Sequence, residues 1–285
     1  MMQTEFSISK FDDWCGGVAG LSRVADYHWA NFSPADISYP DSDLAALADI
    51  EPHSFWFAHR SAVISNIISQ HPPAGAIFDI GGGNGFVSLA LASAGLSCVV
   101  VEPDHSGALT ARRRGLPVIE AAFQNLAVVP GSLPAAGLFD VLEHIEDDMH
   151  ALVRLRLSLV PGGMIYITVP AFHALWSNED VEAGHFRRYT RAHLLEILRA
   201  AGFMPLRATY FFSTLVPAIF LMRSIPGLFQ KQKTSTANIA AQHTLPSGWA
   251  GKLLQHSFRR ELAKIASGRD IAFGSSVLVV AKAVE

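Results

Sequence analysis

The hydrophobic positions of the chain form short apolar runs that alternate with stretches of helical periodicity. The runs are rich in β-branched residues and predict seven strands, at residues 77–80, 98–101, 117–120, 134–139, 164–169, 203–212 and 275–283. Helical spacing of apolar residues predicts helices at 54–69, 86–94, 105–114, 148–159, 190–201 and 249–266. This alternation predicts an α/β, Rossmann-like fold with a mostly parallel sheet and helices on both faces.

The stretch 77–91, IFDIGGGNGFVSLAL, places a buried strand, a glycine turn and a helix start in immediate succession. Its acidic and glycine positions are Asp79, Gly81, Gly82, Gly83 and Gly85. Glycines let the backbone take positive φ and let a ligand approach the main chain, while the first helical turn points its free N–H groups at the same place. This arrangement predicts a nucleotide site.

The residues around the turn narrow the choice of nucleotide. The dinucleotide fingerprint G-x-G-x-x-G requires a third glycine where this chain has Phe86. The acid Asp79 suits a ligand with an ammonium group and repels a pyrophosphate. After the next predicted strand come Glu102 and Pro103, which places the Glu102 carboxylate where it can accept both ribose hydroxyls. The pattern favours an amino acid joined to a nucleoside, S-adenosylmethionine, over a glycine turn followed by a chance acid.

The adenine end of this predicted site is less well defined by the sequence. Ala121, Ala122 and Phe123 follow the third predicted strand, where an acid could otherwise accept from the adenine amino group. Contact with adenine is therefore expected from the backbone, Phe123 or Gln124.

The tail of the fourth predicted strand, DVLEHIEDD, supplies a candidate catalytic residue. Ligands of open α/β sheets bind outside the carboxyl ends of the strands, so this tail is expected in the same crevice as the glycine turn. Asp147 or Asp148 is explained as the N-cap of the next helix. His144, with an ordinary pKa near neutrality, is the candidate base, and a histidine that only orders the loop is the alternative.

The loop that follows the fifth predicted strand is dense in aromatic and charged residues. Between this strand and a helix capped by Thr190 lie Trp176, Asp180, His185, Arg187, Arg188 and Tyr189. One interpretation is a substrate clamp, in which an arginine binds an anionic group and Tyr189 or His185 positions the acceptor. The other is that both arginines pair with nearby acids and cap the sheet.

The helix before the first strand carries a second group of candidate substrate residues, Phe55, Trp56 and Arg60. Phe55, Trp56 and Phe57 together form an aromatic cluster that is too large for one narrow buried face of a helix. They are interpreted either as core packing or as an aromatic wall of the pocket.

Composition limits the partners. At 285 residues and 50% hydrophobic content the chain can bury a large core in one elaborated domain. A net charge of −3 with 16% charged residues does not provide the basic surface that nucleic acids need. The widely separated Cys15 and Cys98 predict neither a disulfide framework nor a metal site, and they favour a reducing, cytoplasmic location. The N-terminus lacks the apolar segment of a signal peptide.

The predicted core covers residues 53–212 and ends with a final strand within 271–285. Residues 1–52 have no sustained period and are expected to form an extension that packs on the core. Residues 213–270 are interpreted as a helical lid insertion, with 230–246 as a linker. Its apolar run 215–229 is broken by Pro217 and Arg223, well short of the ~20 residues of a membrane span. The amphipathic stretch 249–266 leaves peripheral membrane contact as an alternative.

These features resemble the class I S-adenosylmethionine-dependent methyltransferase fold, in which the last strand is antiparallel. FDVLEHIEDD, LVPGGMIYITVPA and GHFRRYT are similar to the methyltransferase type 11 group, often met in bacterial secondary-metabolite, quinone and surface-polysaccharide pathways. The resemblance implies that Asp79 and the glycines hold the methionine moiety and Glu102 the ribose. It also implies that the backbone of Phe139 and Asp140 lies at the sulfonium.

We therefore expect an enzyme that transfers a methyl group by SN2 displacement to a small-molecule or lipid-like acceptor, with His144, His185 and Tyr189 as catalytic candidates. A peripheral-membrane methyltransferase acting on a quinone or lipid-linked sugar is one alternative. An NAD-binding oxidoreductase and a non-catalytic cofactor-binding subunit are others. The sequence leaves the acceptor, the methylated atom and the oligomeric state open.

Overall fold

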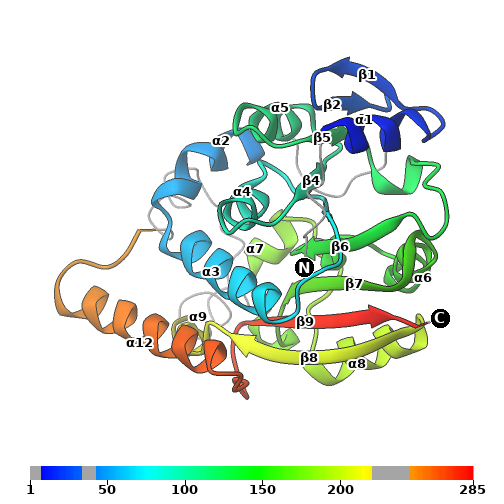
Figure 1. Ribbon diagram of the computed structural model, residues 1–285. Coiled ribbons are helices and arrows are strands. Elements are labelled where there is room, and N and C mark those ends of the chain that lie inside the picture. The colour runs from blue at the N-terminus through cyan, green and yellow to red at the C-terminus, as the bar shows by residue number, and fades with distance from the viewer. Residues whose placement is uncertain (1–7, 34–42, 220–243, 285) are drawn as a thin grey trace.

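The computed structural model describes residues 8–33, 43–219 and 244–284. Its centre is a nine-stranded sheet in the order β1-β2-β5-β4-β3-β6-β7-β9-β8 (Figure 1). The strands are β1 (Ser22–Ala25), β2 (His28–Ala30), β3 (Ile77–Ile80), β4 (Cys98–Val101), β5 (Val118–Glu120), β6 (Leu133–Phe139), β7 (Leu159–Pro170), β8 (Phe203–Phe211) and β9 (Ser276–Ala283).

All seven predicted strands are present, β3 to β9. Strands β5, β4, β3, β6 and β7 are parallel neighbours, whereas β9 is antiparallel to both β7 and β8. The α/β fold with an antiparallel last strand is confirmed. Because the five parallel strands all end at the same edge, the residues after β3, β4 and β6 lie together there.

The sequence analysis expected the N-terminal extension only to pack on the core. In the structure it also adds strands to the sheet. Strand β2 pairs in parallel with β5, and β1 pairs with β2 in an antiparallel manner, so the extension lengthens the sheet by two strands. The buried His28 on β2 contacts Glu120 at the end of β5, with 2.8 Å between Nε2 and Oε2. These strands are short, and the exposed β1 has no alternation of buried and exposed residues to reveal it.

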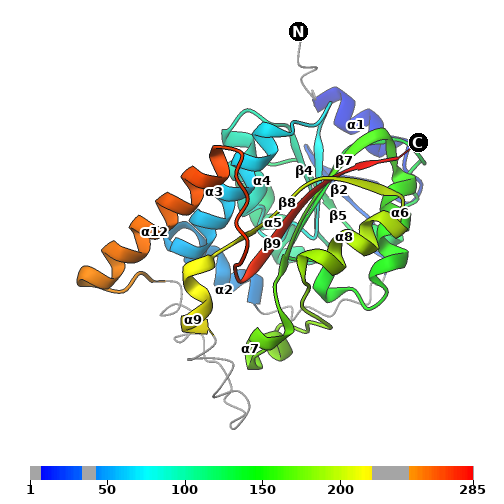
Figure 2. The ribbon, with the colours of Figure 1, turned by 90° about the horizontal axis from the view of Figure 1, so that it is seen from below.

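Helices cover both faces of the sheet. The α-helices are α1 (Ile8–Gly16), α2 (Asp43–Ile50), α3 (Phe55–Gln70), α4 (Phe86–Ser93), α5 (His105–Arg113), α6 (Asp148–Ser158), α7 (Asn178–Glu182), α8 (Arg191–Ala200), α9 (Val216–Ile219) and α12 (Gly248–Ala266). Short 3₁₀ turns are η1 (Glu51–His53), η2 (Phe123–Asn125), η3 (Leu142–His144), η4 (His173–Leu175) and η5 (Ser213–Leu215). Figure 2 shows α3, α4 and α12 on one face and α6 and α8 on the other.

The predicted helix caps explain where the helices begin. The Asp147 side chain accepts a hydrogen bond from the His150 N–H, and Thr190 accepts one from the His193 N–H. Ser54 caps α3 in the same way, by accepting from the N–H groups of Trp56 and Phe57. The cap on α3 fixes where the aromatic residues of its first turn enter the molecule.

The described part of the predicted lid is tied into the helix layer. Glu261 of α12 is buried and accepts from the ring of His59, at 2.9 Å, and from the backbone N–H groups of Phe212 and Ser213. The rings of Phe258 and Phe55 also stack across the two helices, 5.8 Å apart. Helix α12 therefore lies along α3, and the role of residues 213–270 as a lid stays a prediction. Residues 220–229 of the apolar run and 230–243 of the predicted linker lie outside the described residues.

Two further sequence features can be placed. Cys15 and Cys98 are both buried and free. Among the described residues, the helices are too short or too polar to span a bilayer.

Candidate functional site

The glycine turn after β3 has the backbone conformation that the sequence predicts. Gly81, Gly83 and Gly85 all have positive φ, at 67°, 54° and 71°. Gly85 is the N-cap of α4, and a Cβ atom there would lie 2.6 Å from Cδ1 of Leu116. The turn needs glycine both for its left-handed backbone and for this close packing.

Asp79 lies beneath the turn with one carboxylate oxygen available. Its side chain is 1% exposed; Oδ2 accepts from the Ser88 hydroxyl at 2.7 Å, and Oδ1 is buried without a hydrogen-bond partner among the described residues. Burial raises the pKa of Asp79 to about 6. An ammonium group beside Oδ1 would supply the missing donor and favour the ionised carboxylate.

Glu102, after β4, is held against the same turn. One oxygen accepts from the Gly83 N–H at 2.7 Å and the other from the Asp104 N–H at 2.8 Å. Burial raises the pKa of this carboxyl to about 7. Each oxygen keeps a second lone pair, so the side chain can accept two further hydrogen bonds from a diol.

One cavity of about 1210 Å³ joins these residues to most of the other candidates. Of the predicted site residues, those lining it are Asp79, Gly81, Gly82, Gly83, Glu102, Pro103, Phe123, Gln124, Phe139, Asp140, Phe55, Trp56, Arg60, His144, His185 and Arg188. Gly85, Trp176, Arg187 and Tyr189 do not line it. The structure therefore brings all the predicted cofactor residues except Gly85 to one cavity and divides the predicted acceptor residues.

Tyr189 and Arg187 serve the loop rather than the cavity. Tyr189 is fully buried, with its hydroxyl 2.8 Å from Oδ2 of Asp148, and burial with the nearby Asp148 charge raises its pKa well above the ordinary range. Arg187 pairs with the same carboxylate at 2.7 Å. This placement is at odds with the direct acceptor contact predicted for both residues, because neither side chain faces the cavity.

Trp176 also lies outside the cavity. Its ring is half-buried and lies 5.5 Å from the ring of His173, measured between ring centroids. The side chain thus does not line the cavity in which the acceptor is expected to bind.

Asp180, to which the sequence analysis gave no role, organises the cavity side of the same loop. It is 1% exposed and accepts from His185 Nδ1 at 2.8 Å and from Arg188 Nε and Nη2 at 2.7 and 2.9 Å. Burial alone would raise its pKa, but the hydrogen bonds from His185 and Arg188 lower it to about 2. The interpretation in which the loop arginines pair with acids describes this structure better than the substrate clamp does, because the Arg188 guanidinium donates two hydrogen bonds to Asp180.

Arg60 closes the end of β6. Its Nε lies 2.5 Å from Oδ2 of Asp140, and its Nη2 donates to the Phe139 carbonyl at 2.6 Å. Asp140 has a positive φ of 60°, and the Thr168 hydroxyl donates to its Oδ1 at 3.1 Å. Arg60 thus lines the cavity as predicted, but its guanidinium already has partners within the protein.

His144 lines the cavity, but its pKa differs from the sequence-based expectation. Burial and the charge of the neighbouring His185 lower it to about 4, so the ring is neutral at neutral pH. His144 and His185 lie edge to face, with ring centroids 4.6 Å apart. A neutral His144 can accept a hydrogen bond from an acceptor but is a weaker base than predicted.

The sequence analysis gave Glu143, in the tail of the fourth predicted strand, no role of its own. It is 1% exposed and lines the cavity beside His144, and burial followed by the Asp140 charge raises its pKa well above the ordinary range. Its position next to His144 in DVLEHIEDD was a usable signal, because an acid in the tail of a parallel strand falls at the ligand edge.

An apolar wall was also only partly predicted. Phe57 lines the cavity beside Phe55 and Trp56, which supports the aromatic-wall interpretation of α3. Five aliphatic side chains from other helices and turns complete the wall, namely Leu44, Leu47, Leu215, Ile219 and Leu254.

The fold and this site together define the class of the protein. An acid, a glycine turn with positive φ and a second acid after the next strand surround a cavity at the carboxyl edge of a Rossmann-like sheet. The buried, unpartnered Oδ1 of Asp79 and the open lone pairs of Glu102 fit an amino acid linked to a ribose. The protein is a class I S-adenosylmethionine-dependent methyltransferase in fold and cofactor.

Comparison with known proteins identifies the family. A family model described as a methyltransferase domain matches residues 56–207, and the chain belongs to this family. An uncharacterized methyltransferase of Mycobacterium sp. (strain JLS) is 27% identical over 133 residues, covering 43% of this chain and 52% of the relative. A probable S-adenosylmethionine-dependent methyltransferase of Mycolicibacterium smegmatis is 26% identical over 158 residues, covering 53% and 60%. The chain thus spans between half and two thirds of the length of these curated relatives.

Solved structures support the fold. Phosphoethanolamine N-methyltransferase 2 of Haemonchus contortus, in complex with S-adenosyl-L-methionine, aligns with a TM-score of 0.53 at 18% identity, covering 87% of this chain and 58% of that one. At this level of identity the likeness concerns the fold alone.

Proposed function

We propose that the protein transfers a methyl group from S-adenosylmethionine to a small-molecule acceptor with an apolar, lipid-like body. The observation that carries this proposal is the single cavity of about 1210 Å³, which runs from the glycine turn to the aromatic wall and the histidine pair. Pockets for one drug-sized ligand measure about 300 to 1000 Å³. This cavity therefore has room for the cofactor and a second molecule.

The cofactor end of the cavity acts by binding and alignment. Bound S-adenosylmethionine supplies an activated methyl group on a sulfonium. Asp79 can accept from the ammonium group, Glu102 can accept from the ribose hydroxyls, and Phe123 with Gln124 lies where the adenine is expected. Fixing the donor in this way removes much of the entropic barrier of a two-molecule reaction.

The acceptor end combines an apolar wall with one polar corner. Phe55, Trp56 and Phe57 can bury the acceptor body and exclude water. Glu143, His144 and His185 form the corner that would receive the nucleophilic atom. Because His144 is neutral at neutral pH, its proposed role is to orient the acceptor and not to act as the strong base of the sequence-based prediction.

His144→Ala is expected to reduce turnover at least about tenfold, because the acceptor loses its alignment, while affinity for S-adenosylhomocysteine stays unchanged. Formation of S-adenosylhomocysteine should be measured with phenol, quinol and amine acceptors that carry apolar bodies. Amines are included because the Haemonchus neighbour is named as an N-methyltransferase. Calorimetry with S-adenosylhomocysteine supplies the binding control.

Two results would oppose this proposal. Absence of S-adenosylhomocysteine binding together with NAD binding would favour the oxidoreductase alternative. Tight cofactor binding without turnover of any acceptor in the panel would favour a non-catalytic cofactor-binding subunit.

A second candidate is a peripheral-membrane methyltransferase, which the surface of α12 favours. Trp249 and Leu253 lie four residues apart on this helix and are 79% and 60% exposed, with the exposed Lys252 beside them. Tryptophan and lysine are common where a helix meets lipid headgroups. This arrangement would bring a lipid-like acceptor to the cavity, which Leu254 of the same helix lines.

If α12 contacts membranes, replacement of Trp249 and Leu253 with serine should at least halve co-sedimentation with anionic phosphatidylglycerol vesicles. The matched control is Phe32→Ser, because Phe32 is 76% exposed but follows β2, away from α12. Equal sedimentation of the wild type, the double variant and the control would remove the case for a membrane contact through this helix.

A further inference from the structure

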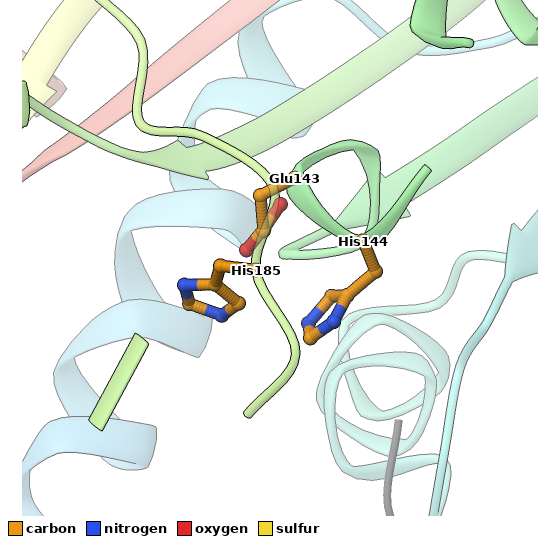
Figure 3. A group of neighbouring side chains, drawn as sticks. All are labelled: Glu143, His144 and His185. Carbon is orange, nitrogen blue, oxygen red and sulfur yellow. The ribbon is translucent and has the colours of Figure 1, made fainter. Parts of the chain in front are cut away.

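Three metal-ligating side chains converge at the polar corner of the cavity. One carboxylate oxygen of Glu143 and one ring nitrogen each of His144 and His185 all lie within 4.8 Å of one another (Figure 3). Glu143 and His144 come from η3 at the end of β6, and His185 comes from the loop after α7. Two separate segments therefore present one carboxylate and two imidazoles to a common point.

One of the two carboxyl oxygens of Glu143 has no hydrogen-bond partner within the described part of the chain. The side chain is 1% exposed, and its Oε2 has no hydrogen-bond partner among the described residues. Burial of an ionised carboxylate without a cation costs several kcal/mol, so a buried acid is ionised only where it is paired with or bound to a cation. Arg60, whose charge acts on Glu143, is engaged with Asp140 and the Phe139 carbonyl.

The two histidines are already oriented by other groups. His185 directs Nδ1 to Asp180, which Arg188 and the Ser177 N–H hold in place, so Nε2 is the nitrogen left for the cluster. The His144 ring is hydrogen-bonded to the Ala183 backbone. A carboxylate or carbonyl behind each imidazole is the usual support of histidine ligands to metals, because it fixes the tautomer and the ring plane.

We propose that Glu143, His144 and His185 bind a divalent transition-metal cation. Cation–ligand distances of about 2.0 to 2.2 Å separate two ligand atoms of a tetrahedral site by roughly 3.3 to 3.6 Å. The ligand atoms of the cluster, which lie within 4.8 Å of one another, would thus close by up to about 1.5 Å on binding, which side-chain rotations can supply. Two imidazoles with one carboxylate suit zinc, cobalt, iron or manganese better than magnesium, which prefers oxygen ligands. This revises the sequence-based expectation of no metal site, which considered only the cysteines.

The site has the features of a reactive centre rather than a structural one. Three protein ligands leave at least one coordination position open, and all three residues line the cavity. An open position facing the cavity can bind an oxygen of the acceptor. Metal binding itself does not depend on the proposed function, but this role of the metal does. If both hold, the acceptor is a molecule that carries a hydroxyl group.

The site can be tested on the full-length protein, free of affinity tag, with zinc, cobalt, manganese and magnesium chloride in separate calorimetric titrations. One zinc or cobalt ion should bind per chain, and cobalt should give a visible d–d absorption band. Glu143→Ala and His185→Ala should each weaken binding at least tenfold and abolish the band. Asp180→Asn, which alters only the support of His185, should weaken binding less than His185→Ala.

His193→Ala is the matched control, because this exposed histidine also lies near a glutamate, with 4.0 Å between Nδ1 and Oε2 of Glu196. Its metal binding should equal that of the wild type. Equal binding by the wild type, Glu143→Ala and His185→Ala, or no binding by the wild type, would overturn the proposal. Circular dichroism and S-adenosylhomocysteine affinity, measured on every variant, separate loss of the metal site from misfolding and from failure of the proposed methyl transfer.

Discussion

Replacing Arg60 with methionine is expected to lower the free energy of unfolding by about 3 kcal/mol. The substitution leaves Asp140 without its cation, and breaking a buried pair from one side typically costs about 3 to 5 kcal/mol. The lower end applies here because the Asp140 side chain is 22% exposed and can take up some water from the cavity. Chemical unfolding monitored by circular dichroism measures the change.

The control for this prediction is Arg23→Met. Arg23 is 50% exposed and pairs with Asp12 and Asp26, so its loss should cost no more than about 1 kcal/mol. Adding Asp140→Asn to Arg60→Met should recover part of the stability, since the uncompensated charge is then removed. Wild-type stability of the Arg60 variant would instead indicate a guanidinium that is free to bind an acceptor, as the sequence predicted.

The sequence could predict that the residues of the cofactor end lie close together, and the reason is local. Asp79, the glycines and Glu102 are each fixed by the strand and turn that contain them, and parallel strands bring strand ends to one edge. Their relative positions therefore follow from spacing along the chain. The structure adds the contacts among them, such as the hydrogen bond from the Gly83 N–H to Glu102, which closes the turn onto the second acid.

The acceptor end could not be predicted in the same way, because its contacts join residues far apart in sequence. Arg60 meets Asp140 across 80 positions, and Tyr189 meets Asp148 across 41. A polar loop residue has many possible partners, and composition does not select among them. The sequence could therefore identify Arg188 as a site residue but not that Asp180 would occupy its guanidinium.

The pKa of His144 could not be predicted from the sequence either. A histidine ordinarily titrates near neutrality, yet burial and the adjacent His185 lower the pKa of His144 to about 4. Both causes depend on the packing of η3 against the loop after α7. The residue was placed correctly, whereas its chemistry required the neighbours.

The charge of Glu102 is expected to determine the affinity of the protein for its cofactor. Glu102→Gln should weaken S-adenosylhomocysteine binding about 100-fold. Two hydrogen bonds to a charged group contribute about 1.5 to 3 kcal/mol each, and the Gln amide would direct an N–H group at the Gly83 or Asp104 N–H. Glu120→Gln is the control, since Glu120 ends the adjacent strand and contacts His28 and His105 outside the cavity.

The pH dependence of this affinity has a definite sign. Ribose hydroxyls favour the ionised carboxylate, so with a pKa of about 7 the wild-type affinity for S-adenosylhomocysteine should be about tenfold weaker at pH 6 than at pH 8.

The stability of the free protein changes in the opposite direction. Burial favours the protonated form, so the contribution of Glu102 is fully present below its ordinary pKa of 4.5 and is lost as the pH rises through about 7. Between pH 5.5 and 8, the wild-type affinity measured by calorimetry should therefore rise with pH, while the contribution of Glu102 to the free energy of unfolding falls. Both pH dependences should be absent in Glu102→Gln. Parallel trends, or a variant with unchanged affinity, would mean that the carboxylate does not hold the ribose.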